Sequence, residues 1–227
     1  MKKIAVLLSG CGVYDGSEIH EATLTLYFLA KAGAEAVPVA PRIPQVETID
    51  HLTGEKAGER RNVLVESARI SRGQIRDIRE VTGSDIDGLI IPGGFGAAKN
   101  LSNFVQAGES CTINEEVKRL IRDMVRRRKP VGTMCIAPVL VAKALQGMSG
   151  VTPTLTIGND PSTAKKLEKL GAIHVTARVD EAIIDEANRI VSTPAYMIGP
   201  DIQDVARGIE NLVKGVIELI EKGEEEV

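Results

Sequence analysis

Three short apolar runs constrain the fold of this chain more than any other feature of its sequence. They occupy residues 4–8, 88–92 and 130–134. Each run is continuous rather than alternating in hydrophobicity, which predicts strands that are buried on both faces. Such strands are typical of a parallel sheet covered by helices on each side, so the chain is predicted to be an α/β protein.

Helical periodicity fills the intervals between the predicted strands. A helix over 18–32 ends at Gly33 and a strand follows over 35–40, so the chain begins β-α-β. The remaining predicted elements are helices over 114–128, 136–145, 162–170 and 202–221, and strands over 154–157, 183–184 and 190–192. Residues 41–87 are less regular and are interpreted as an insertion that carries a helix near 63–71. With no internal repeat, residues 1–227 are predicted to form a single domain.

The composition argues against several classes of partner. The net charge is −3, there is no Trp and only 3% of residues are aromatic, which disfavours a nucleic-acid surface. No apolar run approaches the roughly 20 residues of a membrane-spanning helix. Cysteines at 11, 111 and 135 are odd in number and widely spaced, which argues against a disulfide framework or a zinc site. We expect reduced thiols, a cytoplasmic location, no metal and a small substrate.

Cys135 lies between the strand predicted over 130–134 and the helix predicted over 136–145. Thr133 and Ala137, two positions to each side, are small, as a sharp strand-to-helix turn requires. Such a nucleophile elbow places the thiol at a helix N-terminus, which is expected to lower its pKa and favour the thiolate. Cys135 is therefore the candidate nucleophile, and the alternative is a buried cysteine that only packs.

A glycine-rich turn over 92–96 closes the second apolar run. Its backbone N–H groups, together with that of Ile136, are candidates to stabilise an oxyanion. The alternative is a phosphate-binding turn, because 94–99 and the segment from Gly10 to Gly12 both approximate G-x-G-x-x-G. Neither completes that motif, and a dinucleotide fingerprint would also place an acidic residue where this chain has Ala40 and Pro41. No cofactor is expected.

Two carboxylates are expected beside the candidate nucleophile. Glu18 and Glu21 lie i and i+3 in the first turn of the first helix, on the rim where Cys135 should also lie, and one of them could move a proton there. Acidic residues also favour helix N-termini for dipole reasons alone. His20 is expected on a different face. Cys11 belongs to the same rim, where it either pairs with Cys135 on oxidation or, as we favour, occupies a glycine-rich turn.

Four segments of the chain together resemble the ElbB family. They are 9–21, 92–100, 134–138 and 193–197, with the sequences SGCGVYDGSEIHE, PGGFGAAKN, MCIAP and TPAYM. The resemblance extends over essentially the whole chain. It implies a PfpI-type domain of the class I glutamine amidotransferase-like superfamily, which has a flavodoxin-like three-layer sandwich, a mostly parallel central sheet and a nucleophile elbow. It also implies a homodimer.

The resemblance assigns roles to individual residues. The family's nucleophile corresponds to Cys135, its helix-one glutamate to Glu21 rather than Glu18, and its oxyanion donors to Gly94 and Ile136. The rim residues that the motifs add are Cys11, Glu18, Gly93 and Tyr196. The implied activity is that of a cofactor-independent glyoxalase, which converts glyoxal and related 2-oxoaldehydes to hydroxy acids through a hemithioacetal on the cysteine.

The chain also departs from its superfamily. Ile136 stands where superfamily proteases have a histidine, and the only histidine after Cys135 is His174, which is not in the H-x-E pair of amidotransferases. Protease and glutaminase activities are therefore not expected, and the glyoxalase hypothesis lacks an evident base. The alternatives are a protein deglycase, or a redox-sensing or regulatory thiol protein linked to isoprenoid biosynthesis.

Overall fold

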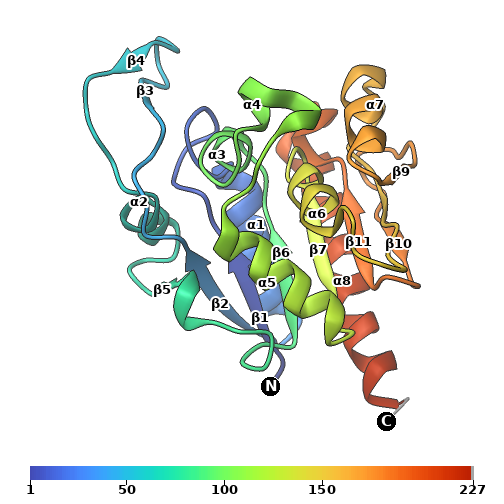
Figure 1. The fold of residues 1–227 in the computed structure, drawn as a ribbon. Coiled ribbons are helices and arrows are strands. Elements are labelled where there is room, and N and C mark those ends of the chain that lie inside the picture. Colours follow the sequence, from blue (N-terminus) through green and yellow to red (C-terminus); the bar gives the residue numbers. More distant parts are fainter. Residues whose placement is uncertain (226–227) are drawn as a thin grey trace.

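The computed structural model describes residues 1–225, which form a central sheet covered by helices (Figure 1). The sheet has seven strands in the order β10-β11-β7-β6-β1-β2-β5, and all neighbours are parallel except β10 and β11. Its strands are β1 (Lys3–Leu7), β2 (Glu35–Ala40), β5 (Arg76–Asp77), β6 (Gly88–Ile91), β7 (Val131–Met134), β10 (Ile183–Asp185) and β11 (Ile190–Thr193). The α/β class and the mostly parallel sheet are as predicted.

The α-helices divide into two layers, one on each face of the sheet. One layer holds α1 (Ile19–Lys31), α2 (Val63–Ile70) and α8 (Ile202–Glu225). The other holds α3 (Phe95–Lys99), α4 (Phe104–Ala107), α5 (Glu115–Arg126), α6 (Pro138–Leu145) and α7 (Pro161–Lys169). The three layers confirm the predicted flavodoxin-like sandwich. Among residues 1–225, no helix is both long and apolar enough to cross a membrane.

The two helical layers explain why the strands are continuously apolar. Along β1, Ala5 and Leu7 belong to the core under α5 and α6, whereas Ile4 and Val6 belong to the core under α1 and α8. Successive side chains of a strand point to opposite faces, so a strand covered on both faces needs an apolar residue at every position. All four of these residues are fully buried.

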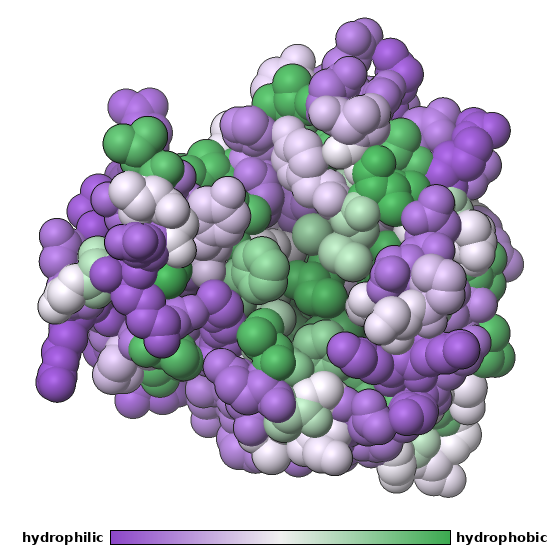
Figure 2. All heavy atoms as spheres, turned by 90° about the horizontal axis from the view of Figure 1, so that it is seen from above, coloured by the Kyte–Doolittle hydropathy of each residue, from purple (hydrophilic) through white to green (hydrophobic). Residues whose placement is uncertain are grey.

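The order of the strands reverses beside β1. The chain runs from β1 to β2 on one side and later returns to place β6 on the other side. In open α/β sheets, ligands bind at such a switch point, beyond the carboxyl ends of the strands. Figure 2 views the molecule from above, and apolar atoms gather there in a central hollow with a largely polar border.

Several local details differ from the sequence-based expectations. The helix after Cys135 begins at Pro138, two residues later than predicted, because residues 135–137 form a turn. The segment predicted as a strand over 154–157 forms β8 (Thr154–Leu155), which pairs with β9 (Ile173–His174) outside the central sheet. Within 41–87, β3 (Thr48–Ile49) and β4 (Lys56–Ala57) form a hairpin that projects from the molecule (Figure 1). The strand β5 was not predicted.

Candidate functional site

Cys135 occupies the turn between β7 and α6 with a strained backbone. Its φ angle is 58°, a left-handed conformation that non-glycine residues adopt rarely. The Cys135 N–H donates to the carbonyl oxygen of Thr193 at 3.1 Å, which ties the turn to the end of β11. The side chain is 8% exposed. The sequence therefore forms a sharp strand-to-helix turn with a nearly buried cysteine at its start.

Backbone donors approach the sulfur from two loops. The N–H groups of Gly94 and Ile136 both hydrogen-bond Cys135 and act to lower its thiol pKa. Gly94 has φ 95°, and a Cβ there would clash with the backbone of Glu18. At Gly93, a Cβ would lie 2.5 Å from the Cys135 Cβ. Both positions thus require glycine for the loop to pass this close to Glu18 and Cys135.

Glu21 lies in the first turn of α1 and is fully buried against the thiol. Its Oε2 accepts the N–H of Gly93 at 2.8 Å, its Oε1 accepts the N–H of Tyr196 at 3.3 Å, and its side chain hydrogen-bonds Cys135. Burial, followed by the negative charge of Glu18, raises the pKa of Glu21 to about 8. At neutral pH this carboxyl group is therefore largely protonated.

The pKa of the Cys135 thiol differs from the expectation. Burial, followed by the charge of the Glu21 carboxylate, raises this pKa well above its ordinary value. The predicted lowering was wrong because α6 starts only at Pro138 and because the thiol is buried. Cys135 and Glu21 therefore form a pair that holds its protons at neutral pH.

Glu18 has a different role from Glu21 in the structure. It is the N-cap of α1, and its Oε2 accepts the N–H of Glu21 at 2.7 Å. Its own N–H donates to the carbonyl oxygen of Gly93 at 3.0 Å. Glu18 therefore holds the glutamate and the glycine loop in position, while Glu21 contacts the sulfur.

Cys11 lies in the loop after β1 but has other neighbours than Cys135. It is half-buried, and its charged surroundings are Glu66, Arg69, Asp15 and Arg61. Burial is the largest cause that raises the pKa of its thiol. Cys11, Cys111 and Cys135 are all free thiols. Cys11 lies between Gly10 and Gly12, which both have positive φ angles.

Tyr196 and His20 form a contact that the sequence did not predict. Tyr196 lies in the 3₁₀-helix η3 (Ala195–Met197), and its hydroxyl oxygen lies 2.7 Å from Nδ1 of His20. His20 is exposed and stands between Glu18 and Glu21 in the chain. The contact joins the first turn of α1 to η3.

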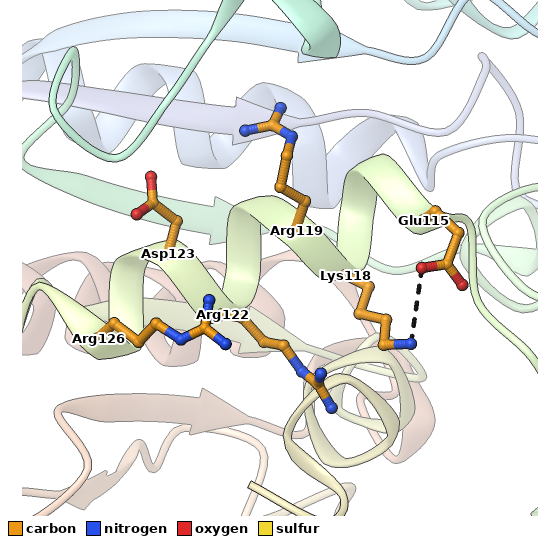
Figure 3. A pocket seen from close by; sticks show the side chains of 6 residues that line it. All are labelled: Glu115, Lys118, Arg119, Arg122, Asp123 and Arg126. Carbon is orange, nitrogen blue, oxygen red and sulfur yellow. Dashed lines mark ion pairs between the residues drawn. The ribbon is translucent and has the colours of Figure 1, made fainter.

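Another hollow of about 440 Å³ lies along the outer face of α5 (Figure 3). Its lining residues are Glu115, Lys118, Arg119, Arg122, Asp123 and Arg126. Arg122 donates to the carbonyl oxygens of Ala144 and Gln146, and Arg119 donates to those of Ile78 and Val81. These arginines therefore satisfy the carbonyl groups of neighbouring segments. Within residues 1–225, no group of three or more His, Cys, Asp and Glu side chains could hold a metal ion.

Fold, elbow and donor loop together define a class I glutamine amidotransferase-like domain. A human protein named glutamine amidotransferase-like class 1 domain-containing protein 3, mitochondrial, is 44% identical over 230 residues, which cover 97% of this chain and 84% of the human chain. The mitochondrial ES1 protein of Danio rerio is 35% identical over 96% of this chain and 86% of its own. No family model matches.

Solved structures agree with the sequence relatives. The crystal structure of an isoprenoid biosynthesis protein with amidotransferase-like domain from Ehrlichia chaffeensis superimposes with a TM-score of 0.88 at 36% identity, over 95% of this chain and 99% of that one. Drosophila melanogaster DJ-1beta shares the fold, with a TM-score of 0.54 at 17% identity over 98% and 97% of the two chains. The chain belongs to the ElbB family of the class I glutamine amidotransferase-like superfamily.

Proposed function

We propose that this protein is a cofactor-independent glyoxalase that converts glyoxal, and related 2-oxoaldehydes, to hydroxy acids. The observation that carries this proposal is the contact of the Cys135 thiol with a buried carboxyl group and two backbone N–H donors. A thiol in this setting can add to an aldehyde, and the donors can hold the resulting oxygen. Because Cys135 is 8% exposed, small aldehydes fit the site best.

The chemistry balances without an external oxidant or reductant. The Cys135 sulfur bonds to one aldehyde carbon as the C=O π bond opens. The thiol proton passes to the Glu21 carboxylate and from there to the aldehyde oxygen, which gives a hemithioacetal and restores the carboxylate. Glu21 then removes the proton from that carbon and returns it to the neighbouring carbon, through an enediol. The product is a thioester of a hydroxy acid. Water cleaves this thioester and restores the thiol, so one carbon is oxidised while the other is reduced.

Steady-state turnover of glyoxal tests the proposal. Parent protein should form glycolate, Cys135→Ala should form none above the uncatalysed rate, and Cys111→Ala should behave like the parent. Cys111 is the matched control because it is also a buried free thiol but packs in the core on the α5 face. Equal turnover by Cys135→Ala and parent would overturn the proposal.

The absence of a histidine directly after Cys135 supports a second candidate, a regulatory or redox-sensing thiol protein. Ile136 occupies that position. The relative from Ehrlichia chaffeensis is named an isoprenoid biosynthesis protein, so such regulation would concern that pathway. This candidate predicts stoichiometric modification of Cys135 without turnover. A deglycase would instead release hydroxy acid from glycated protein faster than from free glyoxal.

The proposal also covers the cellular compartment and the oligomeric state of the protein. Three free thiols fit a reducing compartment, and we propose the cytoplasm, while the curated relatives are named mitochondrial. Fractionation of the source cells tests this. We also propose a homodimer, which light scattering coupled to size-exclusion chromatography tests.

A further inference from the structure

The glyoxalase reaction requires a proton transfer that Glu21 alone does not supply. While Glu21 moves a proton between the two carbons, the proton on the hemithioacetal oxygen must leave, and the oxygen of the second carbon must gain one. The N–H groups of Gly94 and Ile136 can hold an oxyanion but cannot exchange protons in this way. A second group at the rim is therefore needed.

We propose that Tyr196 and His20 form a proton relay for the oxygen atoms of the bound aldehyde. Tyr196 donates its hydroxyl proton to the oxygen of the second carbon as the enediol forms. His20 supplies a proton to Tyr196, and the proton of the hemithioacetal oxygen returns to the pair as the thioester forms. The relay ends with the protons it started with, and this inference rests on the proposed glyoxalase function.

The positions of the two side chains support this relay. Tyr196 is bound to the site through its backbone, because its N–H donates to Oε1 of Glu21 at 3.3 Å. Its ring packs against the core cluster that contains Cys135. The hydroxyl oxygen lies 2.7 Å from Nδ1 of His20, which is exposed to solvent. Tyr196 thus contacts the buried carboxyl group of the site through its backbone and a solvent-exposed imidazole through its hydroxyl.

The backbone next to Tyr196 has an unusual conformation. Ala195 is fully buried and has φ 44°, a left-handed conformation that non-glycine residues adopt rarely. Strain of this kind persists where the surroundings fix it, and it is concentrated at functional sites. Here the unusual conformation lies at the residue directly before Tyr196. Burial, followed by the charges of Glu18 and Glu21, raises the pKa of the Tyr196 phenol, so the hydroxyl carries a proton at neutral pH.

Turnover of glyoxal by Tyr196→Phe and His20→Ala tests the relay, with Tyr27→Phe as the control. Tyr27 is an exposed tyrosine of α1. We expect Tyr196→Phe to lower kcat by about 100-fold and His20→Ala by about tenfold, with KM changed less than twofold. Added imidazole should restore part of kcat to His20→Ala but leave Tyr196→Phe unchanged, which a merely structural contact would not produce.

Protection of Cys135 from iodoacetamide by glyoxal separates the steps. In both variants, glyoxal should protect Cys135 at the same glyoxal concentration as in the parent protein. Hemithioacetal formation does not use the relay. A kcat of Tyr196→Phe within twofold of the parent value would overturn the relay. A variant that lost both turnover and the protection of Cys135 by glyoxal would overturn it as well. If the parent and Tyr27→Phe both fail to turn glyoxal over, the proposed function itself is wrong.

Discussion

Replacement of Glu21 by glutamine should stabilise the protein increasingly as the pH rises. Below pH 4.5, Glu21 is protonated in both the folded and the unfolded chain. Between pH 4.5 and about 8, the unfolded chain releases this proton while the folded chain retains it, so the parent loses folding stability. Each pH unit in this interval costs about 1.4 kcal/mol, so the loss is about 3 kcal/mol at pH 7 and about 5 kcal/mol above pH 8.

Glutamine is nearly isosteric with glutamate and stays neutral, so the Glu21→Gln variant should not show this loss. Urea unfolding of parent and variant at pH 5, 7 and 9 measures the difference in the free energy of unfolding, which should grow in favour of the variant. A difference that stays constant over this range would refute the assignment of a buried, largely protonated carboxyl group to Glu21.

Glu47 offers a control of opposite sign. Lys99 and Lys56 hydrogen-bond its carboxylate and lower its pKa. A lowered pKa contributes stability above the unfolded value of about 4.5, and this contribution is lost as the pH falls below it. The pH dependence caused by Glu47→Gln should therefore lie below pH 4.5 and be absent between pH 5 and 9.

Three further predictions concern the same site. The kcat/KM for glyoxal should rise with pH through about 8, because Glu21 accepts a proton only as a carboxylate, and a flat profile from pH 6 to 9 would contradict this. Gly93→Ala should lower turnover by about 100-fold, because the added Cβ would lie 2.5 Å from the Cys135 Cβ and 2.8 Å from Oε2 of Glu21. Gly58→Ala, where no atom lies within 4 Å, is its control in the same assay. Glu18→Ala should lower the free energy of unfolding by about 1 kcal/mol in thermal unfolding, because the helix cap is lost. Its kcat should stay higher than that of Glu21→Gln. The opposite ranking would make Glu18 the reacting carboxylate.

Much of the sheet could be predicted because burial on both faces leaves a direct mark on the sequence. The strands β1 and β6, which carry loops of the site, are continuous apolar runs apart from their first residues. The edge strand β5 is the opposite case. It consists of Arg76 and Asp77 and pairs only with β2, so it carries no apolar pattern that could reveal it.

The candidate site could be predicted only in part. The small residues around Cys135 indicated the sharp turn, but the direction of the thiol pKa depends on its burial beside Glu21, which only the folded structure gives. Periodicity placed Glu18 and Glu21 equally well, and only their hydrogen bonds separate the helix cap from the residue at the sulfur. The contact of His20 with Tyr196 joins positions 176 residues apart, so no local pattern indicates it.

The most direct test of Cys135 as the nucleophile is peptide mass mapping of the protein quenched during turnover of glyoxal. A covalent adduct should appear on the peptide that contains Cys135, form no more slowly than glycolate, and decay when glyoxal is exhausted. The peptides with Cys11 and Cys111 should stay unmodified on this timescale. Glycolate that accumulates while the Cys135 peptide remains unmodified would contradict the account.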